Sequence, residues 1–174
     1  KKLDELNGVG LIVLANVPAS ALNGLMGRRT LRQFVERGGG LLVFGGPFSL
    51  GKGEYAESIL EPVLPVATKG PWDFMKVNSA AVKVARNSPI TSDLDWEKKP
   101  ILCYCQATTP KDGAETLLEC NGMPVLVTGQ YGKGRVAVFA GTNLGATTEN
   151  QVFFYQWPDY AKLLTRVIQW LLRT

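Results

Sequence analysis

A glycine-rich stretch near the end of the first quarter of the chain has the spacing most suggestive of chemistry. Gly46, Gly51 and Lys52 fit the pattern G-x-x-x-x-G-K, in which backbone amides cradle phosphate groups and the lysine neutralises them. The next position needs Ser or Thr to hold magnesium, but it is Gly53, and Pro47 removes one backbone donor from the loop. The spacing alone therefore does not predict a nucleotide hydrolase.

Hydrolases that use a serine or cysteine nucleophile also need a histidine base. Ser49 lies in the same stretch, but Pro47 stands where the motif G-x-S-x-G requires its first glycine. The chain contains no histidine, which excludes a Ser-His-Asp or Cys-His mechanism. Two pairs of acidic residues are interpreted as solvated surface charges: Asp93 with Asp95, and Glu54 with Glu57.

The three cysteines form no recognisable metal-binding or disulfide pattern. Cys103, Cys105 and Cys120 lack the spacing of a zinc site, and no histidine completes one. We interpret them first as small buried hydrophobic residues, with one bridge from Cys103 or Cys105 to Cys120 as the alternative. No metal ion or other cofactor is expected.

The composition is typical of a soluble globular domain. The 174 residues are 45% hydrophobic and 20% charged, and no apolar run reaches the ~18 residues of a membrane span. The net charge of +4 comes from scattered lysines and arginines, so nucleic acid is not an expected partner.

The beginning of the sequence indicates a domain taken from a longer polypeptide. The first residue is Lys1, and no signal-peptide pattern follows it. Residues 1–174 are expected to form a single domain, with other domains of the parent protein among its partners. The compartment is left open, an extracytoplasmic or membrane-associated parent protein being one alternative.

The elements that position the glycine-rich stretch are predicted from hydrophobic patterns. Residues 10–17 form a continuous apolar run, which is typical of a strand covered on both faces in a parallel sheet. Leu31, Phe34 and Val35 then recur at helical spacing, and residues 41–44 form a second buried strand. Strand, helix and strand in this order predict a right-handed βαβ unit that ends in the glycine-rich loop.

The rest of the sequence indicates antiparallel strands and a final helix. A short helix is expected at residues 55–60, before Pro62. Strand-like runs separated by turn residues follow at 80–85, 101–106, 115–120, 124–130 and 135–140. Asn121 and Gly122 form a strong hairpin signal, and the last helix is expected to begin near Pro158.

These patterns together predict an α/β domain with a parallel core and an antiparallel extension. In open α/β sheets, ligands bind outside the carboxyl ends of the strands. Residues 45–53 follow directly after a predicted parallel strand, so the sequence places the loop where a binding site is expected.

The sequence resembles the class I glutamine amidotransferase-like superfamily. It is more similar to a divergent bacterial branch of amidotransferase-like domains, found inside larger and often membrane-associated proteins, and to trehalose-utilisation-like proteins. The resemblance implies a three-layer, flavodoxin-like parallel sheet. The stretches that carry it are 11–18, 34–53 with Tyr55, 64–66, 88–91 and 131–140.

The resemblance also indicates which catalytic residues are missing. Phe44-Gly45-Gly46-Pro47 looks like the oxyanion loop of the active enzymes. Their nucleophile lies on a later Gly-x-Cys-x-Gly turn, and no cysteine of this chain has glycines at that spacing. Their late His-Pro-Glu motif corresponds to Gly141-Thr142-Asn143 here, to within a residue or two. Glutamine hydrolysis by the family's mechanism is therefore not expected.

Our leading hypothesis is a non-catalytic amidotransferase-like domain that binds a small molecule or a partner at the carboxyl edge of the sheet. The aromatic segment 153–157 is interpreted as part of the core beneath the last helix, with ligand contact as the alternative. Two other functions stay open, an interaction or scaffold module and a hydrolase without a Cys-His triad. The candidate ligand-binding residues are Gly45, Gly46, Phe48, Ser49, Gly51, Lys52, Thr142 and Asn143.

Overall fold

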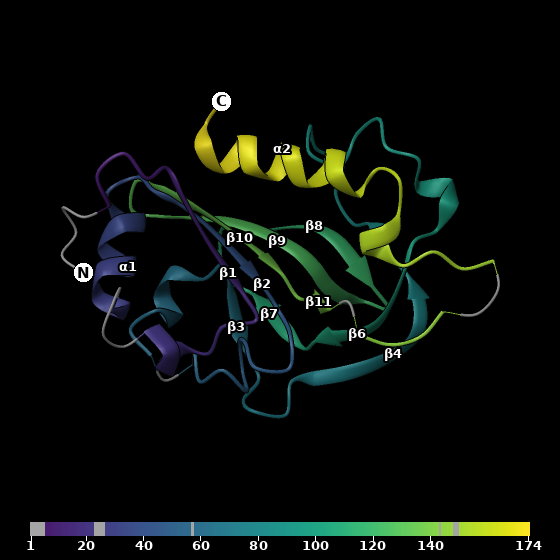
Figure 1. Cartoon of the computed structure of the whole chain (residues 1–174), viewed down its shortest axis with the longest axis horizontal. Coiled ribbons are helices and arrows are strands. Elements are labelled where there is room, and N and C mark those ends of the chain that lie inside the picture. The colour runs from purple at the N-terminus through teal and green to yellow at the C-terminus, as the bar shows by residue number, and fades with distance from the viewer. Residues whose placement is uncertain (1–5, 23–26, 57, 143, 148–149) are drawn as a thin grey trace.

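A six-stranded mixed sheet forms the centre of the protein (Figure 1). The computed structural model describes residues 6–22, 27–56, 58–142, 144–147 and 150–174. The strand order is β1-β2-β10-β9-β8-β5. In that order the strands are β1 Leu11–Ala15, β2 Gly40–Phe44, β10 Gly134–Phe139, β9 Met123–Tyr131, β8 Glu115–Cys120 and β5 Lys83–Val84.

Three of these strands, β1, β2 and β10, run parallel to one another. Leu11 of β1 and Arg135 of β10 both pair with Gly40 of β2, so the carboxyl ends of the strands lie level at one edge. Helix α1, Arg28–Glu36, connects β1 to β2, which confirms the predicted βαβ unit. Strand β10 pairs with β2 although the two segments lie almost a hundred residues apart in the chain. The local sequence pattern did not predict this pairing.

The antiparallel half of the sheet follows the predicted turns closely. Strand β9 pairs with β10 on one side and with β8 on the other, both in antiparallel orientation. The hairpin between β8 and β9 turns at Asn121 and Gly122, whose φ values of 50° and 73° lie in the left-handed region that this turn type requires. The hairpin prediction is confirmed.

Two smaller antiparallel sheets flank the central one. The first has the order β11-β6-β4 and the second pairs β3 with β7. Their strands are β4 Phe74–Ala81, β6 Ile101–Gln106, β11 Gly141–Thr142, β3 Val66–Thr68 and β7 Thr108–Pro110.

Two sequence predictions in this region are wrong. Residues 80–85 do not form one strand, because β4 pairs with β6 while β5 pairs with β8 in the central sheet. The described part of 55–60 forms turns instead of a helix, and a short 3-10 helix follows at Glu61–Val63. Pro62 is compatible with that first turn because no backbone N–H is needed there.

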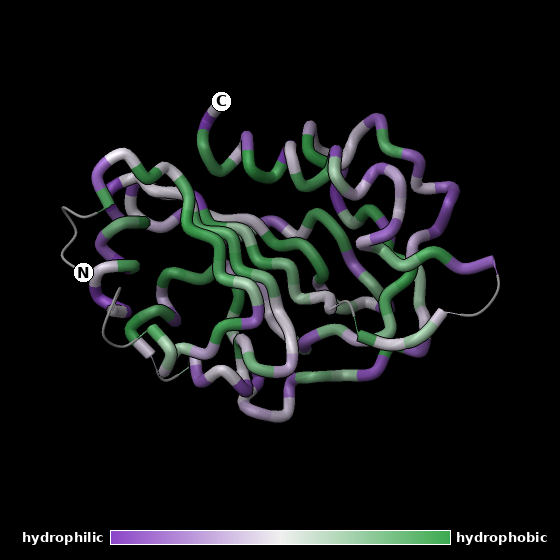
Figure 2. Tube along the Cα trace, viewed as in Figure 1, coloured by the Kyte–Doolittle hydropathy of each residue, from purple (hydrophilic) through white to green (hydrophobic). Residues whose placement is uncertain are grey.

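Helices α1 and α2 cover opposite faces of the central sheet. Leu41 and Val43 of β2 join the core beneath α1, whereas Leu42 joins the core beneath α2, Tyr160–Leu172. This alternation follows from the two-residue period of a strand. In Figure 2 the central strands are mostly hydrophobic, while hydrophobic and hydrophilic residues alternate along α2. The fold is thus a mixed α/β structure with few helices, in which the inner strands β2 and β10 are mostly buried.

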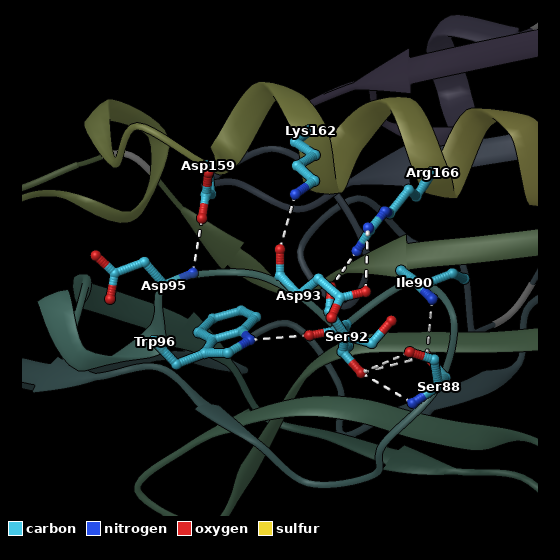
Figure 3. Close-up of polar contacts among 10 residues, drawn as sticks. Ser88, Ile90, Ser92, Asp93, Asp95, Trp96, Asp159, Lys162 and Arg166 are labelled. Carbon is cyan, nitrogen blue, oxygen red and sulfur yellow. Dashed lines mark hydrogen bonds and ion pairs between the residues drawn. The ribbon is translucent and has the colours of Figure 1, made fainter.

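The last helix begins at Tyr160, two residues after the predicted start, and polar contacts hold its first half in place (Figure 3). Asp159 Oδ2 accepts a hydrogen bond from the Asp95 backbone N–H at 2.7 Å. Lys162 Nζ donates to the Asp93 carbonyl at 2.8 Å. These contacts fix the start of α2, and so the position of Tyr160, against the segment that precedes β6.

The aromatic segment before α2 belongs mainly to the core. Phe154 and Trp157 are buried in the cluster beneath the helix, as the first of the two sequence interpretations predicted. Within the described residues, neither helix is long and apolar enough to cross a bilayer.

Candidate functional site

The glycine-rich loop that follows β2 is held in place by hydrogen bonds to side chains of distant segments. Several of its backbone donors are already used within the protein, so the loop does not form an open phosphate cradle. Three N–H groups have such partners: Gly46 with Gln106 Oε1 at 2.9 Å, Phe48 with Asn16 Oδ1 at 2.8 Å, and Gly51 with Asp73 Oδ2 at 2.9 Å.

Gln106 and Asp73 form the centre of this network. Gln106 is completely buried, and its Nε2 group donates to the Ser49 carbonyl at 2.9 Å and to Asp73 Oδ2 at 3.2 Å. Burial raises the pKa of Asp73, while hydrogen bonds from Gly51 and Gln106 act in the opposite direction. We call Asn16, Gln106 and Asp73 together the loop clamp.

Close packing against the clamp explains why this loop needs glycine. A Cβ atom on Gly51 would lie 2.0 Å from the Gly70 carbonyl oxygen and 2.7 Å from the Asp73 carboxylate. A Cβ atom on Gly45 would lie 2.2 Å from Gln106 Oε1. Both glycines therefore permit contact with the protein's own atoms, without any need for a ligand.

A cavity of about 420 Å³ opens beside the start of the same loop. It lies at the carboxyl ends of β1, β2 and β10 and extends to the first turn of α2. Its walls include Ala15 and Asn16 from β1 and the residue after it, and Gly45 with Gly46 from the loop. This is the edge at which open α/β sheets bind ligands.

Aromatic rings line the side of the cavity that faces α2. Phe44 and Phe139 stack with their centroids 5.2 Å apart, and Phe154 meets Tyr160 edge to face at 5.4 Å. A tyrosine hydroxyl with its ordinary pKa of about 10 is protonated at neutral pH. Burial raises the pKa of Tyr160 further, so this hydroxyl can donate a hydrogen bond. The cavity therefore combines ring surfaces with a small number of polar groups.

The structure brings only part of the predicted ligand-binding set to this cavity. Gly45, Gly46 and Thr142 line it. The other predicted residues are placed as follows: Ser49 and Gly51 are buried against the clamp, Phe48 and Lys52 are exposed and do not line the cavity, and Asn143 lies outside the described residues.

The cysteines lie within strands and apart from the cavity. Cys103, Cys105 and Cys120 are buried free thiols, which agrees with the interpretation of small buried hydrophobic residues and not with a bridge. A hydrogen bond with Cys120, together with burial, raises the pKa of the Cys105 thiol. A thiol in that state is a poor nucleophile.

The sequence comparison identifies the family. The sequence model of the family described as "putative glutamine amidotransferase" matches residues 18–173. The chain belongs to this family. The glycine-rich loop, α2 and the cavity lining other than Ala15 and Asn16 lie within the matched part of this amidotransferase-like chain.

Solved structures of similar fold include two bacterial proteins described as cytoplasmic. STM1381 from Salmonella typhimurium LT2 has 25% sequence identity and a TM-score of 0.82, with 98% of this chain and 75% of that chain covered. STM3548 from Salmonella typhimurium has 24% identity and a TM-score of 0.83, with coverages of 98% and 74%.

The fold also occurs as a portion of a much larger enzyme. A cold-adapted β-galactosidase from Rahnella sp. R3 matches 94% of this chain over 23% of its own length, with 15% identity and a TM-score of 0.62. A comparison with curated proteins finds no match.

Sequence reasoning missed several residues of this amidotransferase-like site. Gln106 and Asp73 carry no local motif, and their role depends on contacts with a loop more than twenty residues away. Asn16 had a usable signal, because it lies near the end of the strand predicted at residues 10–17 and so belongs at the carboxyl edge. Tyr160 was predicted only as part of the apolar face of the last helix.

Proposed function

We propose that this chain is a non-catalytic amidotransferase-like domain that binds a small molecule in the cavity at the carboxyl ends of β1, β2 and β10. The cavity carries the proposal, because its volume of about 420 Å³ lies in the usual range for ligand pockets. Its position at the end of the parallel strands supports the same assignment.

The absence of the family's catalytic groups supports a binding role over a glutaminase role. The sequence has no histidine, and its cysteines are buried in strands outside the cavity wall. Covalent amide hydrolysis needs an accessible nucleophile with a positioned base. The proposal therefore separates the family's fold from the family's chemistry.

For the fold itself we propose a reduced form of the three-layer, flavodoxin-like arrangement, in a single domain spanning residues 1–174. The helices on opposite faces of the sheet support this view. The parallel part is reduced to three strands, and an antiparallel extension occupies the other side.

Within the cavity we assign ligand contact to Gly45, Gly46 and Thr142, and a supporting role to the remainder of the loop. Because STM1381 is described as a cytoplasmic protein, we favour a cytoplasmic location over an extracytoplasmic or membrane-associated one.

The test is a thermal-stability screen against sugars, nucleotides, amino acids including glutamine, small neutral aromatic compounds, and divalent metal ions. A ligand present at 100 times its dissociation constant should stabilise the folded domain by about 2.7 kcal/mol. The screen includes Ala15→Trp, which places a large side chain in the cavity, and Val13→Trp as its control. Val13 shares the strand face but does not line the cavity.

A stabilisation that wild type and Val13→Trp share and Ala15→Trp lacks would support the proposed function. Binding that is equal in all three proteins, or absent with every compound class, would contradict it.

A second candidate function is an interaction module for other domains of a parent protein. The observation that favours it is Trp72, whose side chain is 89% exposed although large apolar side chains are normally covered. The occurrence of the fold as 23% of the Rahnella β-galactosidase chain is consistent with such a role. If it is right, Trp72→Ser will weaken association with the rest of the parent protein and leave ligand binding unchanged.

A further inference from the structure

The chemistry of the cavity walls indicates what kind of ligand they accept, given the proposed function on which this inference rests. The walls are made mostly of aromatic rings, backbone and aliphatic groups, including Leu102 and Val125. None of the described residues that line the cavity carries a charged side chain. A ligand placed there would exchange water for apolar surface without gaining a countercharge.

The backbone donors at the cavity rim are not available to an anion. Gly45 N–H donates to the Phe139 carbonyl at 2.7 Å, and Gly46 N–H donates to Gln106 at 2.9 Å. Pro47 has no N–H group. A carboxylate or phosphate would therefore lose its hydration here without receiving backbone hydrogen bonds from this part of the loop.

The nearest charged groups of the loop region are directed elsewhere. Lys52 Nζ lies 5.6 Å from the centroid of the exposed Phe48 ring. Asp73 is buried beneath the loop, where it accepts hydrogen bonds from Gly51 and Gln106. Neither residue lines the cavity.

Three uncharged polar side chains at the wall are suited to orient a ligand. Asn16 Oδ1 already accepts a hydrogen bond from the Phe48 N–H, so its Nδ2 group is the part of that amide left for a ligand. Thr142 is positioned by the pairing of β11 with Tyr104 of β6. Tyr160 carries the hydroxyl at the α2 side of the cavity.

We propose that the cavity binds a neutral ligand with a flat apolar ring and one or two hydrogen-bonding groups, and that it does not accept glutamine or another charged metabolite. The stacked and edge-to-face rings provide surfaces that favour an aromatic group. Glutamine is a zwitterion, and both of its charges would have to be desolvated at walls that offer no opposite charge.

The test compares benzamide with benzoate, which have the same ring and nearly the same shape but differ in charge. Dissociation constants are measured by NMR titration of the whole domain. We expect benzamide to bind at least tenfold more tightly than benzoate. Ala15→Trp should weaken benzamide binding at least tenfold, whereas Val13→Trp should leave it within a factor of two.

The outcomes separate this inference from the proposed function. If benzoate or glutamine binds as tightly as benzamide and Ala15→Trp abolishes that binding, the cavity is a binding site but the ligand class is wrong. If neither probe binds and the wider screen finds no ligand that depends on Ala15, both proposals are overturned. If benzamide binds and Ala15→Trp has no effect, the ring-binding site lies elsewhere and the inference fails.

Discussion

The two regions that border the loop after β2, the clamp and the cavity, differ in how densely they are packed and in how many hydrogen bonds they make to the loop. On one side the clamp of Asn16, Gln106 and Asp73 holds the loop with directed hydrogen bonds, and of these three residues only Asn16 also lines the cavity. On the other side a cavity of about 420 Å³ is walled by rings and small residues. The comparison teaches that the glycines of a loop at a ligand-binding edge need not all serve the ligand. Here Gly51 allows close packing against the clamp, whereas Gly45 and Gly46 also line the cavity.

The largest effect on the clamp side is expected from Gln106→Ala. This change leaves the Gly46 N–H without its buried partner, removes one of the hydrogen bonds to the Asp73 carboxylate and creates a small cavity. We expect a loss of about 4 kcal/mol in the free energy of unfolding. Gln130→Ala, at an exposed position of β9, is the control and should change it by less than about 0.5 kcal/mol. Denaturant titration measures the free energy of unfolding of both variants. Equal losses would show that the clamp does not stabilise the loop more than an exposed surface residue does.

A smaller but still large effect is expected from Gly51→Ala. The new Cβ atom would overlap the Gly70 carbonyl and force the loop away from Asp73, at a cost of about 2–3 kcal/mol. Gly122→Ala is the matched control, since its Cβ would meet nothing within 4 Å and only its φ of 73° is unfavourable. That strain alone costs about 1–2 kcal/mol. If Gly122→Ala were the more damaging change, close packing would not be the reason for glycine at position 51.

The pH dependence of stability should reveal the buried carboxylate of the clamp. The pKa of Asp73 is raised in the folded protein by burial, so the unfolded chain loses this proton first as the pH rises. Protonation of Asp73 therefore contributes to the free energy of unfolding. That contribution is complete below the unfolded pKa of about 3.9 and is lost as the pH rises through the folded pKa. The stability of wild type relative to Asp73→Asn should therefore fall with increasing pH over that window. A relative stability that rises with pH would show that the pKa is lowered instead.

The smallest effect is expected on the cavity side, from Tyr160→Phe. Loss of one hydroxyl hydrogen bond to the ligand should weaken benzamide binding roughly two- to tenfold, as expected for a hydrogen bond worth about 0.5–1.5 kcal/mol. The free energy of unfolding should change little, because the ring and its contact with Phe154 are kept. Calorimetric titration combined with thermal unfolding separates the two quantities. A loss of stability without a loss of affinity would assign this hydroxyl to the fold.

Local signals in the sequence predicted the elements well. Apolar runs identified β1 and β2, helical spacing of Leu31 and Phe34 identified α1, and Asn121 with Gly122 identified the hairpin. Each of these features depends on residues close together in the chain. Predictions failed where tertiary contacts decide the strand pairing. At Val82 the chain passes from the sheet that contains β4 to the sheet that contains β5.

The site was predictable only in outline. The carboxyl-edge rule located the region, and Gly45, Gly46 and Thr142 do line the cavity. The division between clamp and cavity was not predictable, because it depends on Gln106 reaching a loop 57 residues earlier in the chain. No motif marks a buried glutamine whose partners are backbone groups of a distant segment.

The most direct test of the central claim is a two-dimensional amide NMR titration of the wild-type domain with benzamide. The account predicts chemical-shift changes concentrated at Gly45, Gly46, Gly141 and Thr142, with little change at Gly51. Changes concentrated at Gly51 and its neighbours, with the cavity residues unaffected, would contradict it and would assign ligand binding to the loop itself.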